Sequence, residues 1–382
     1  MQVNRYLLFF LLIFLGTSCI DPYHPLIEES QEVLIIYGVV TDHPGLHKVT
    51  VSSSTPYNDP SLVPVSGCVV RVEDALGEMV LYSETDPGVY EAFLTESFLG
   101  INRSYSLFVN TPDGQDYQSS YDTLLACPPV DRIYFEVEAQ GTSDPEVTFQ
   151  GIQFYSDLTG SEETSRNFRW KLEETWEYNS AVLANLIWYG GKLYPILGDS
   201  INTCYMTEPI RELYSASTRY LAENKLTRNK LAFVSGATPR IKLQYSLLVK
   251  QQSLTGEIFN YWEKMKSQNG GEEGLYETQP SSTVGNIYNV TNPEAKVLGC
   301  FYATQEQSKR LTIKTNFDFI VKGFTCQVDT ARSLDDLGTA FPYLLRSLDP
   351  LGVGPPYLNG SRSCFDCQIK GGTNEEPEYW LP

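Results

Sequence analysis

Histidine is scarce in this 382-residue sequence, and its distribution limits the available chemistry more than any motif does. All three histidines, His24, His43 and His47, lie near the amino terminus. The long region beyond them therefore cannot assemble a Ser-His-Asp triad, a Cys-His pair or a histidine-ligated zinc site. Pro44 and Gly45 between His43 and His47 are typical of a turn, so we interpret these two as exposed loop residues and not as metal ligands.

Basic residues are also few compared with acidic ones. The chain has 28 Lys and Arg against 47 Asp and Glu, a formal net charge of −19. Nucleic-acid-binding proteins need a basic footprint, so we predict no nucleic-acid partner. With 42% hydrophobic and 20% charged residues, the chain is too apolar to be disordered.

Motifs for cofactors and catalysis are missing as well. No GxGxxG or Walker loop occurs, and we predict no cofactor, no metal site and no catalytic residue. Adjacent carboxylates such as Glu173 and Glu174 do not identify a glycosidase pair. Such a pair is defined by separation in space, and neighbours on a strand point to opposite faces.

The first 18 residues are predicted to be a lipoprotein signal peptide. Arg5 supplies the positive start, and the apolar run Tyr6–Leu15 is too short to span a bilayer. Small residues then lead into Cys19, which is the lipoprotein pattern, with the aliphatic Leu15 one position further out than usual. We predict lipidation of Cys19, which would anchor the chain in a membrane; the alternative is a cleaved, unlipidated secretory peptide.

Residues 19–32 are expected to form a tether, because the stretch contains two prolines and several acids. Acidic residues just after the lipidated cysteine resemble a surface-export signal, although a plain solvated linker explains them too. No segment of the remaining chain approaches eighteen consecutive apolar residues, so we predict no transmembrane helix.

Residues 33–126 read as a β-sandwich of the transthyretin or immunoglobulin type. Runs of about five to eight residues with strand character alternate there with turns such as Pro87-Gly88 and Asp113-Gly114. Such a module is expected to be a spacer or docking domain.

Cys127-Pro128-Pro129 is predicted to be a linker, because consecutive prolines stiffen the chain and cannot join a ladder. Residues 130–382 then form a larger β-rich domain. Within it, the sequence assigns no fold to residues 181–235.

That domain should contain one amphipathic helix. Apolar residues recur at the helical period there, namely Leu254, Ile258, Tyr261, Trp262 and Met265. Ser253 or Thr255 can cap its start, and Gly270-Gly271 ends it. Tyr261 and Trp262 could serve as a ligand platform, but we favour an apolar face packed on a sheet, with Trp262 in the core.

Seven cysteines follow Cys19, so at least one is free or pairs between molecules. Cys364-Phe-Asp-Cys367 could be a redox motif, half of a zinc site or a structural bridge. Two further zinc ligands are not evident, and a Gly-rich tail is not a thioredoxin-like setting. We therefore predict a Cys364–Cys367 disulfide. The pairing of Cys68, Cys127, Cys204, Cys300 and Cys326 stays open.

Residues 274–286 are predicted to form an ordered loop, in which Pro280 and Gly285 set the backbone geometry. Ordered loops on β scaffolds are where binding residues concentrate. We hypothesise that Tyr276 and Gln279 contact a partner or ligand; the alternative is a loop that covers a sheet edge.

Several stretches resemble a known family, namely YGVVTD, YSLLVKQQSLTGEIFNYWEKMK, LYETQPSSTVGNIY, AKVLGCFYA and CFDCQIKGGTNEEPEYW. They are similar to a family of Bacteroidota outer-membrane lipoproteins catalogued as a domain of unknown function, DUF4249. The resemblance implies a surface lipoprotein that accompanies TonB-dependent outer-membrane receptors, and it supplies no catalytic residues. Cys300 stands where that family usually has an aromatic residue, which argues against a family-wide bridge there.

Taken together, these features favour a non-catalytic, lipid-anchored protein of the outer membrane that binds a ligand or docks on a TonB-dependent transporter. A carboxylate-based glycan hydrolase would also tolerate the lack of histidine. A structural or assembly factor of the cell envelope is the third hypothesis.

Overall fold

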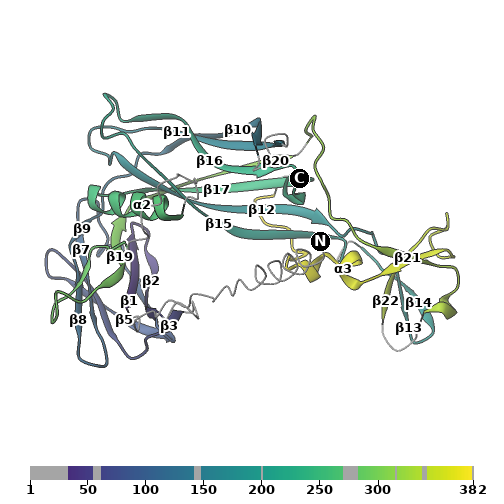
Figure 1. Cartoon of the computed structure of the whole chain (residues 1–382), viewed down its shortest axis with the longest axis horizontal. Coiled ribbons are helices and arrows are strands. Elements are labelled where there is room, and N and C mark those ends of the chain that lie inside the picture. The colour runs from purple at the N-terminus through teal and green to yellow at the C-terminus, as the bar shows by residue number, and fades with distance from the viewer. Residues whose placement is uncertain are drawn as a thin grey trace, which may run out of the picture.

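The computed structural model describes residues 33–54, 62–141, 148–198, 201–269, 283–314, 316–337 and 342–380. Strands dominate throughout, which confirms the predicted mainly β class. Figure 1 shows three bodies in a row: an N-terminal sheet, a central body of two sheets, and a small C-terminal sheet. In the described part of the chain, no helix is both long and apolar enough to cross a membrane.

The N-terminal sheet has eleven strands, which follow the order β18-β8-β7-β4-β5-β6-β2-β1-β19, with β3 on β2 and β9 on β7. Its strands are β1 (Leu34–Thr41), β2 (Gly45–Ser54), β3 (Leu62–Pro64), β4 (Val69–Asp74), β5 (Met79–Asp86), β6 (Val89–Leu94), β7 (Ser104–Asn110), β8 (Asp116–Ser119), β9 (Asp122–Thr123), β18 (Ile287–Asn289) and β19 (Val297–Thr304). The strands alternate between buried apolar and more exposed positions, as in β4 and β6, which places one face on a common core.

The two ends of this sheet meet, so that it nearly closes. The Asn286 side chain next to β18 donates to the carbonyl oxygen of Phe301 at 2.7 Å and accepts from the Phe301 amide at 3.0 Å. The approach is so close that a Cβ on Gly285 would lie 1.8 Å from the carbonyl oxygen of Gly299. The strands form one nearly closed sheet, so the β-sandwich that we predicted for residues 33–126 stays a prediction.

The N-terminal sheet is not confined to the predicted residues 33–126, because β18 and β19 from residues 287–304 complete it. β1 pairs in parallel with β19 along its whole length, from Leu34 opposite Val297 to Thr41 opposite Thr304. A parallel pair needs a long connection between its strands, here most of the chain. No local turn signal announces such a partner, so the sequence assigned β19 to the second domain.

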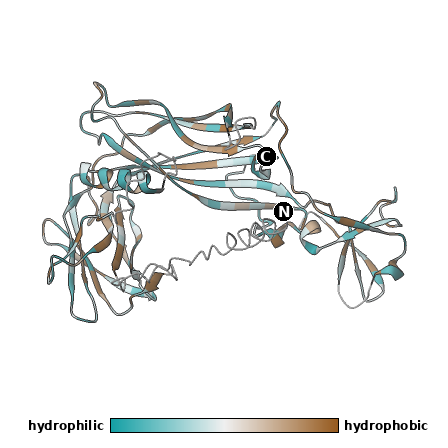
Figure 2. Cartoon of the chain, in the orientation of Figure 1, coloured by the Kyte–Doolittle hydropathy of each residue, from teal (hydrophilic) through white to brown (hydrophobic). Residues whose placement is uncertain are grey.

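The central body contains two sheets that share one core. The first has the order β10-β11-β16 and the second β15-β12-β17-β20. Their strands are β10 (Val130–Gly141), β11 (Thr148–Thr159), β16 (Lys225–Ser235), β15 (Thr203–Ser217), β12 (Asn167–Asn179), β17 (Gln244–Ser253) and β20 (Glu306–Lys314), with the short helix η1 (Pro239–Ile241) before β17. Phe154 of the first sheet stacks on Tyr245 of the second, with ring centroids 5.5 Å apart. Apolar and polar segments intersperse along these strands in Figure 2.

The predicted amphipathic helix is confirmed as α2 (Gly256–Asn269), and its apolar face packs as expected. Trp262 is buried there against Cys300 and Tyr302 of β19. The guanidinium of Arg169 lies 3.4 Å from the centre of the Trp262 ring and donates to the Tyr302 hydroxyl at 3.1 Å. This buried cation therefore joins the helix to both sheets beneath it.

The two residues expected to cap α2 bind elsewhere. The Thr255 hydroxyl donates to the carboxylate of Asp122 in β9 at 2.6 Å, and the Ser253 hydroxyl donates to the Leu125 carbonyl at 2.6 Å. Both hydroxyls thus link the central body to the N-terminal sheet.

The C-terminal sheet has five strands in the order β14-β13-β22-β23-β21. Its elements are β13 (Leu186–Tyr189), β14 (Lys192–Pro195), β21 (Val328–Ala331), η2 (Leu334–Asp336), β22 (Tyr343–Ser347) and β23 (Tyr357–Gly360), followed by α3 (Arg362–Phe365) and η3 (Cys367–Lys370). Residues 181–235, whose fold we could not predict, thus supply strands to this sheet and to both central sheets.

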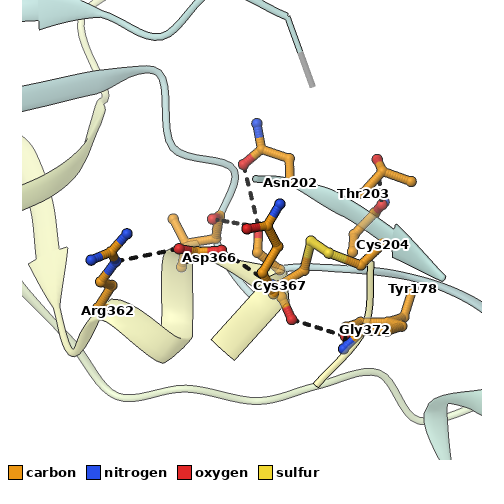
Figure 3. Close-up of a disulfide and its surroundings, with 12 residues drawn as sticks. Tyr178, Asn202, Thr203, Cys204, Arg362, Asp366, Cys367 and Gly372 are labelled. Carbon is orange, nitrogen blue, oxygen red and sulfur yellow. Dashed lines mark hydrogen bonds and ion pairs between the residues drawn. A yellow bond between two sulfur atoms is a disulfide. The ribbon is translucent and has the colours of Figure 1, made fainter. Parts of the chain in front are cut away.

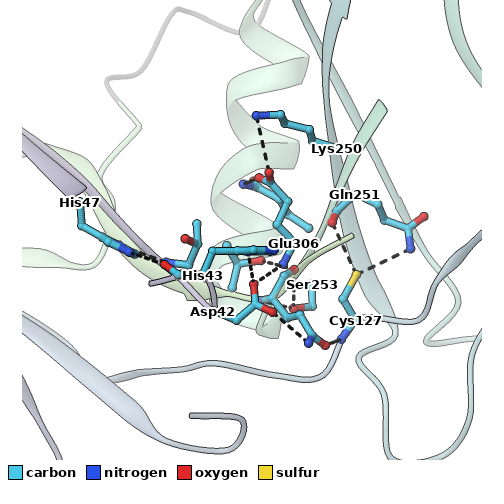
Figure 4. A network of polar contacts seen from close by, with 12 residues as sticks. Asp42, His43, His47, Cys127, Lys250, Gln251, Ser253 and Glu306 are labelled. Atoms are coloured by element: carbon cyan, nitrogen blue, oxygen red, sulfur yellow. Dashed lines mark hydrogen bonds and ion pairs between the residues drawn. The ribbon is translucent and has the colours of Figure 1, made fainter. Parts of the chain in front are cut away.

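Gln305, the one residue between β19 and β20, stands at the junction of the N-terminal sheet and the central body. Its side chain donates to Asp42 at 3.0 Å and accepts from the Cys127 amide at 2.8 Å. The Glu306 amide also donates to Asp42, at 3.0 Å. Figure 4 shows this network, in which the β1–β2 turn, the Cys127 linker and the β19–β20 turn meet.

His43 and His47 belong to the same junction, and the prediction that both are exposed is wrong for His47. Its ring is buried, with Nε2 at 3.0 Å from the His43 carbonyl oxygen and the Thr41 amide donating to Nδ1 at 3.4 Å. His43 is open to solvent, and its Nδ1 lies 2.9 Å from the Asp42 carboxylate. His47 sits on the inward side of β2, so the strand alternation buries it.

Gln251 completes the junction from the inner side of β17. This fully buried side chain donates to the Pro128 carbonyl at 2.7 Å and accepts from the Trp170 indole at 3.1 Å.

We predict that Gln251→Leu lowers the free energy of unfolding by about 3 kcal/mol, because two buried polar groups lose their partner. Chemical denaturation measures this, with Gln150→Leu at an exposed position as the matched control. Equal stability of the two variants would contradict the role of Gln251.

Asp122 makes the junction sensitive to pH. Burial raises the pKa of its carboxyl group to about 6, well above the ordinary value near 3.8. Since the folded pKa lies above the unfolded one, the fold loses stability as Asp122 ionises between about pH 4 and pH 6, by about 2–3 kcal/mol. We expect Asp122→Asn to remove this component, so that the stability of the variant relative to the wild type rises over this interval. Urea unfolding at a series of pH values tests it; a difference independent of pH would count against the buried carboxyl.

Candidate functional site

A groove opens on the central body at the end of β12 that lies away from the junction. Two adjoining cavities of about 210 Å³ and about 390 Å³ share Pro239 and Phe324 as walls. We call them together the Phe324 groove. Other residues that line it are Trp176, Tyr178, Asn179, Ser180, Met206, Glu208, Arg240, Lys242 and Lys370.

The strand alternation of β12 explains which aromatic residues reach this groove. Glu174, Trp176 and Tyr178 follow at every second position and face the inner side of the sheet. η1 and the segment around Phe324 share the walls of these cavities with Trp176 and Tyr178. The Nε1 of Trp176 is buried and has no partner among the described residues.

Charged side chains surround the apolar walls. Arg240 forms an ion pair with the buried Glu174, with 2.6 Å between Nη1 and the carboxylate, and Tyr245 donates to the same carboxylate at 2.8 Å. Lys370 lies over the Phe324 ring, 4.0 Å from its centre. The groove thus offers fixed charges of both signs next to aromatic surface, an arrangement typical of small-molecule sites.

Tyr178 connects the groove to the C-terminal segment. Its ring meets Phe324 edge-on, with centroids 5.3 Å apart. Its hydroxyl donates to the Cys367 carbonyl at 2.9 Å and accepts from the Gly372 amide at 3.2 Å. Burial raises the pKa of Tyr178, so the phenol stays protonated and can act as this donor at neutral pH.

The predicted Cys364–Cys367 disulfide is wrong. Cys367 pairs with Cys204 of β15 at a Cα–Cα distance of 5.8 Å, and Cys364 pairs with Cys326 at 5.7 Å. Figure 3 shows the Cys204–Cys367 bridge beside Tyr178 and Gly372. This bridge holds η3, and with it Lys370, against the wall of the groove.

Cys364 and Cys367 do not pair with each other because of the backbone conformation between them. Residues three apart share a face only if the helix continues, but α3 ends at Phe365, and the next residue, Asp366, has an extended backbone. Asp366 then starts η3 by accepting from the Gln368 amide at 3.1 Å. Cys364 is thereby directed to a small core with Phe365, whereas Cys367 faces the core of the central body.

Peptide mapping tests these pairings, since cleavage before Asp366 separates Cys364 from Cys367. We predict that, without reductant, the two halves are found bound to the peptides of Cys326 and Cys204 respectively. A crosslinked pair that contains only Cys364 and Cys367 would contradict the structure. Reduced and alkylated protein, in which all four peptides run free, is the control.

The remaining cysteines of the described chain are free and buried. Burial raises the pKa values of Cys127 and Cys300 to about 12, so both thiols stay protonated at neutral pH. Cys300 packs under α2, which explains why it forms no bridge.

Cys19, Tyr276 and Gln279 are outside the described residues, so lipidation and the loop hypothesis stay predictions. The end of the loop region is described: Gly285 makes its close approach to β19, as given above. Sequence reasoning missed the groove because its walls come from distant segments. Only the alternation of Trp176 and Tyr178 along β12 gave a local signal.

Comparison with known proteins identifies a family and little else. The model of the family described as Domain of unknown function (DUF4249) matches residues 20–310. No curated protein matches the chain. Among solved structures, the chain is similar to the Yersinia pseudotuberculosis adhesin InvE at 12% sequence identity, with 83% of this chain and 68% of that chain covered. The TM-score is 0.16, so this likeness carries no argument about fold or function.

Proposed function

This chain belongs to the DUF4249 family, and from that premise we propose that it is a non-catalytic lipoprotein of the outer membrane that binds a ligand and docks on a TonB-dependent transporter. The observation that carries the binding role is the Phe324 groove. Aromatic side chains, an ion pair and the ammonium group of Lys370 converge there from four separate segments of the chain.

The groove is preformed, which favours binding over a purely structural role. Arg240 is fixed by Glu174, and the Cys204–Cys367 bridge fixes the segment that carries Lys370. A site whose polar groups are already held in place loses less conformational entropy when a ligand enters.

The support for a lipid anchor comes from the sequence. An apolar run followed by small residues and Cys19 is the lipoprotein pattern, and residues 19–32 would tether the folded part to the lipid. Docking on a TonB-dependent transporter is inferred from the motifs shared with outer-membrane lipoproteins of this family.

The hydrolase alternative has one observation in its favour. Glu174 and Glu208 lie directly opposite each other on β12 and β15, and Glu208 lines the groove. Glycoside hydrolysis needs one carboxyl group that gives up a proton and a second that acts as base or nucleophile. Arg240 and Tyr245 already donate to the Glu174 carboxylate, so both of its oxygens are engaged within the protein. The pair is therefore better suited to holding a ligand than to cleaving one.

The proposed function is tested by purifying the full-length protein from detergent-solubilised outer membranes. We predict that a TonB-dependent receptor is recovered with it, and that its intact mass includes acyl chains on Cys19. Cys19→Ala should lose both the acyl mass and the membrane fraction. Phe324→Ala combined with Lys370→Ala should impair ligand capture while anchoring is unchanged.

Three results would overturn the proposal in different ways. A mature wild-type protein without acyl mass removes the anchor. Recovery of envelope assembly machinery in place of a receptor favours the assembly factor. Release of glycan fragments by the purified protein alone, abolished by Glu208→Gln, favours the hydrolase.

A further inference from the structure

A second groove lies on the central body where the two sheets present their edge strands β15 and β16. It has a volume of about 650 Å³, within the range of small-molecule sites. β15, β16 and α2 each contribute to its lining, and neither cavity of the Phe324 groove shares a residue with it. We call it the Leu213 groove.

An irregularity in β15 directs side chains into this groove. Trp170 of β12 pairs with Tyr214, and Leu172 pairs with Ile210, so Lys171 alone faces the three residues 211–213. Such a bulge bends the strand and re-aims its side chains, and bulges are common next to functional sites. Here it brings Arg211 and Leu213 to the groove together.

The groove gathers positive charge on an otherwise acidic protein. Arg211, Lys230 and Lys266 line it, from β15, β16 and α2, although the chain has a formal charge of −19. Among the described residues, no carboxylate lies within ion-pair distance of Arg211 or Lys266, and Lys230 is 4.0 Å from Glu138. The one acidic residue of the lining, Glu212, accepts from the Tyr214 hydroxyl.

The floor of the groove is apolar. Leu213, Tyr214 and Leu231 form it, and Leu231 is buried. Gln153 stiffens this floor, because its amide donates to the Leu231 carbonyl at 2.8 Å and to the Ala232 carbonyl at 3.2 Å. Protection of a sheet edge would explain exposed charges on β15, and Pro209 serves that purpose too. Edge protection does not explain why basic side chains from β15, β16 and α2 surround the same apolar cavity.

We propose that the Leu213 groove binds an amphipathic organic anion. The anionic group lies between Arg211, Lys230 and Lys266, and the apolar part lies on Leu213, Tyr214 and Leu231. Charge-assisted hydrogen bonds supply the selectivity for an anion, and burial of the apolar part supplies affinity.

The test uses decanoate as the probe and calorimetry on the mature chain with Cys19→Ala, kept free of detergent. We expect decanoate to bind at one site, and to bind more weakly as the salt concentration rises. Decyl glucoside and decyltrimethylammonium have the same apolar part without the negative charge and should bind at least about tenfold more weakly.

Two double variants locate the site. Arg211→Gln with Lys266→Gln should weaken decanoate binding by about tenfold or more. Lys48→Gln with Lys264→Gln removes the same charge from exposed positions outside the groove and should leave affinity unchanged. Thermal unfolding should be alike in all of them, because all four side chains are exposed. The proposal is overturned if decanoate does not bind, if the neutral probe binds as tightly, or if the Arg211 and Lys266 variant retains full affinity.

Discussion

One run of backbone, residues 297–314, serves as a strand in two bodies of the protein. Its first half, β19, pairs in parallel with β1 and closes the N-terminal sheet, and its second half, β20, pairs with β17 in the central body. Only Gln305 separates the halves, and its side chain binds both Asp42 and the amide of Cys127. The orientation of the two bodies is therefore fixed by hydrogen-bonded backbone and not by a loose linker, although consecutive prolines follow Cys127.

This constraint also relates the candidate sites to one another. β12 pairs with β17 from Phe168 opposite Ser253, at the junction, to Trp176 opposite Tyr245, at the Phe324 groove. The junction and that groove thus lie at opposite ends of the same two strands. The Leu213 groove opens beside the bulge between them. A partner bound at the N-terminal sheet and a ligand in either groove would share one continuous scaffold.

The features predictable from sequence were those with local causes. The period of 3.6 residues located α2 and its buried Trp262, and short strand runs between turns located most of β1 to β8. Features that depend on distant partners were missed. Nothing near residue 300 indicates a parallel partner at residue 37, and nothing in Cys364-Phe-Asp-Cys367 shows that Asp366 turns the chain and separates the two thiols. His47 was judged by its turn neighbours, whereas its place on the inward side of β2 decides its burial.

The N-terminal sheet and the central body should unfold as one unit, because residues 297–314 belong to both. Native-state hydrogen exchange on the intact chain, followed amide by amide as denaturant increases, tests this coupling most directly. We predict that amides of β1, β7 and β17 converge on one common free energy of opening. If the amides of β1 and β7 exchanged through a separate opening of lower free energy while β17 stayed protected, the N-terminal sheet would be an independent domain. That result would contradict unfolding as one unit.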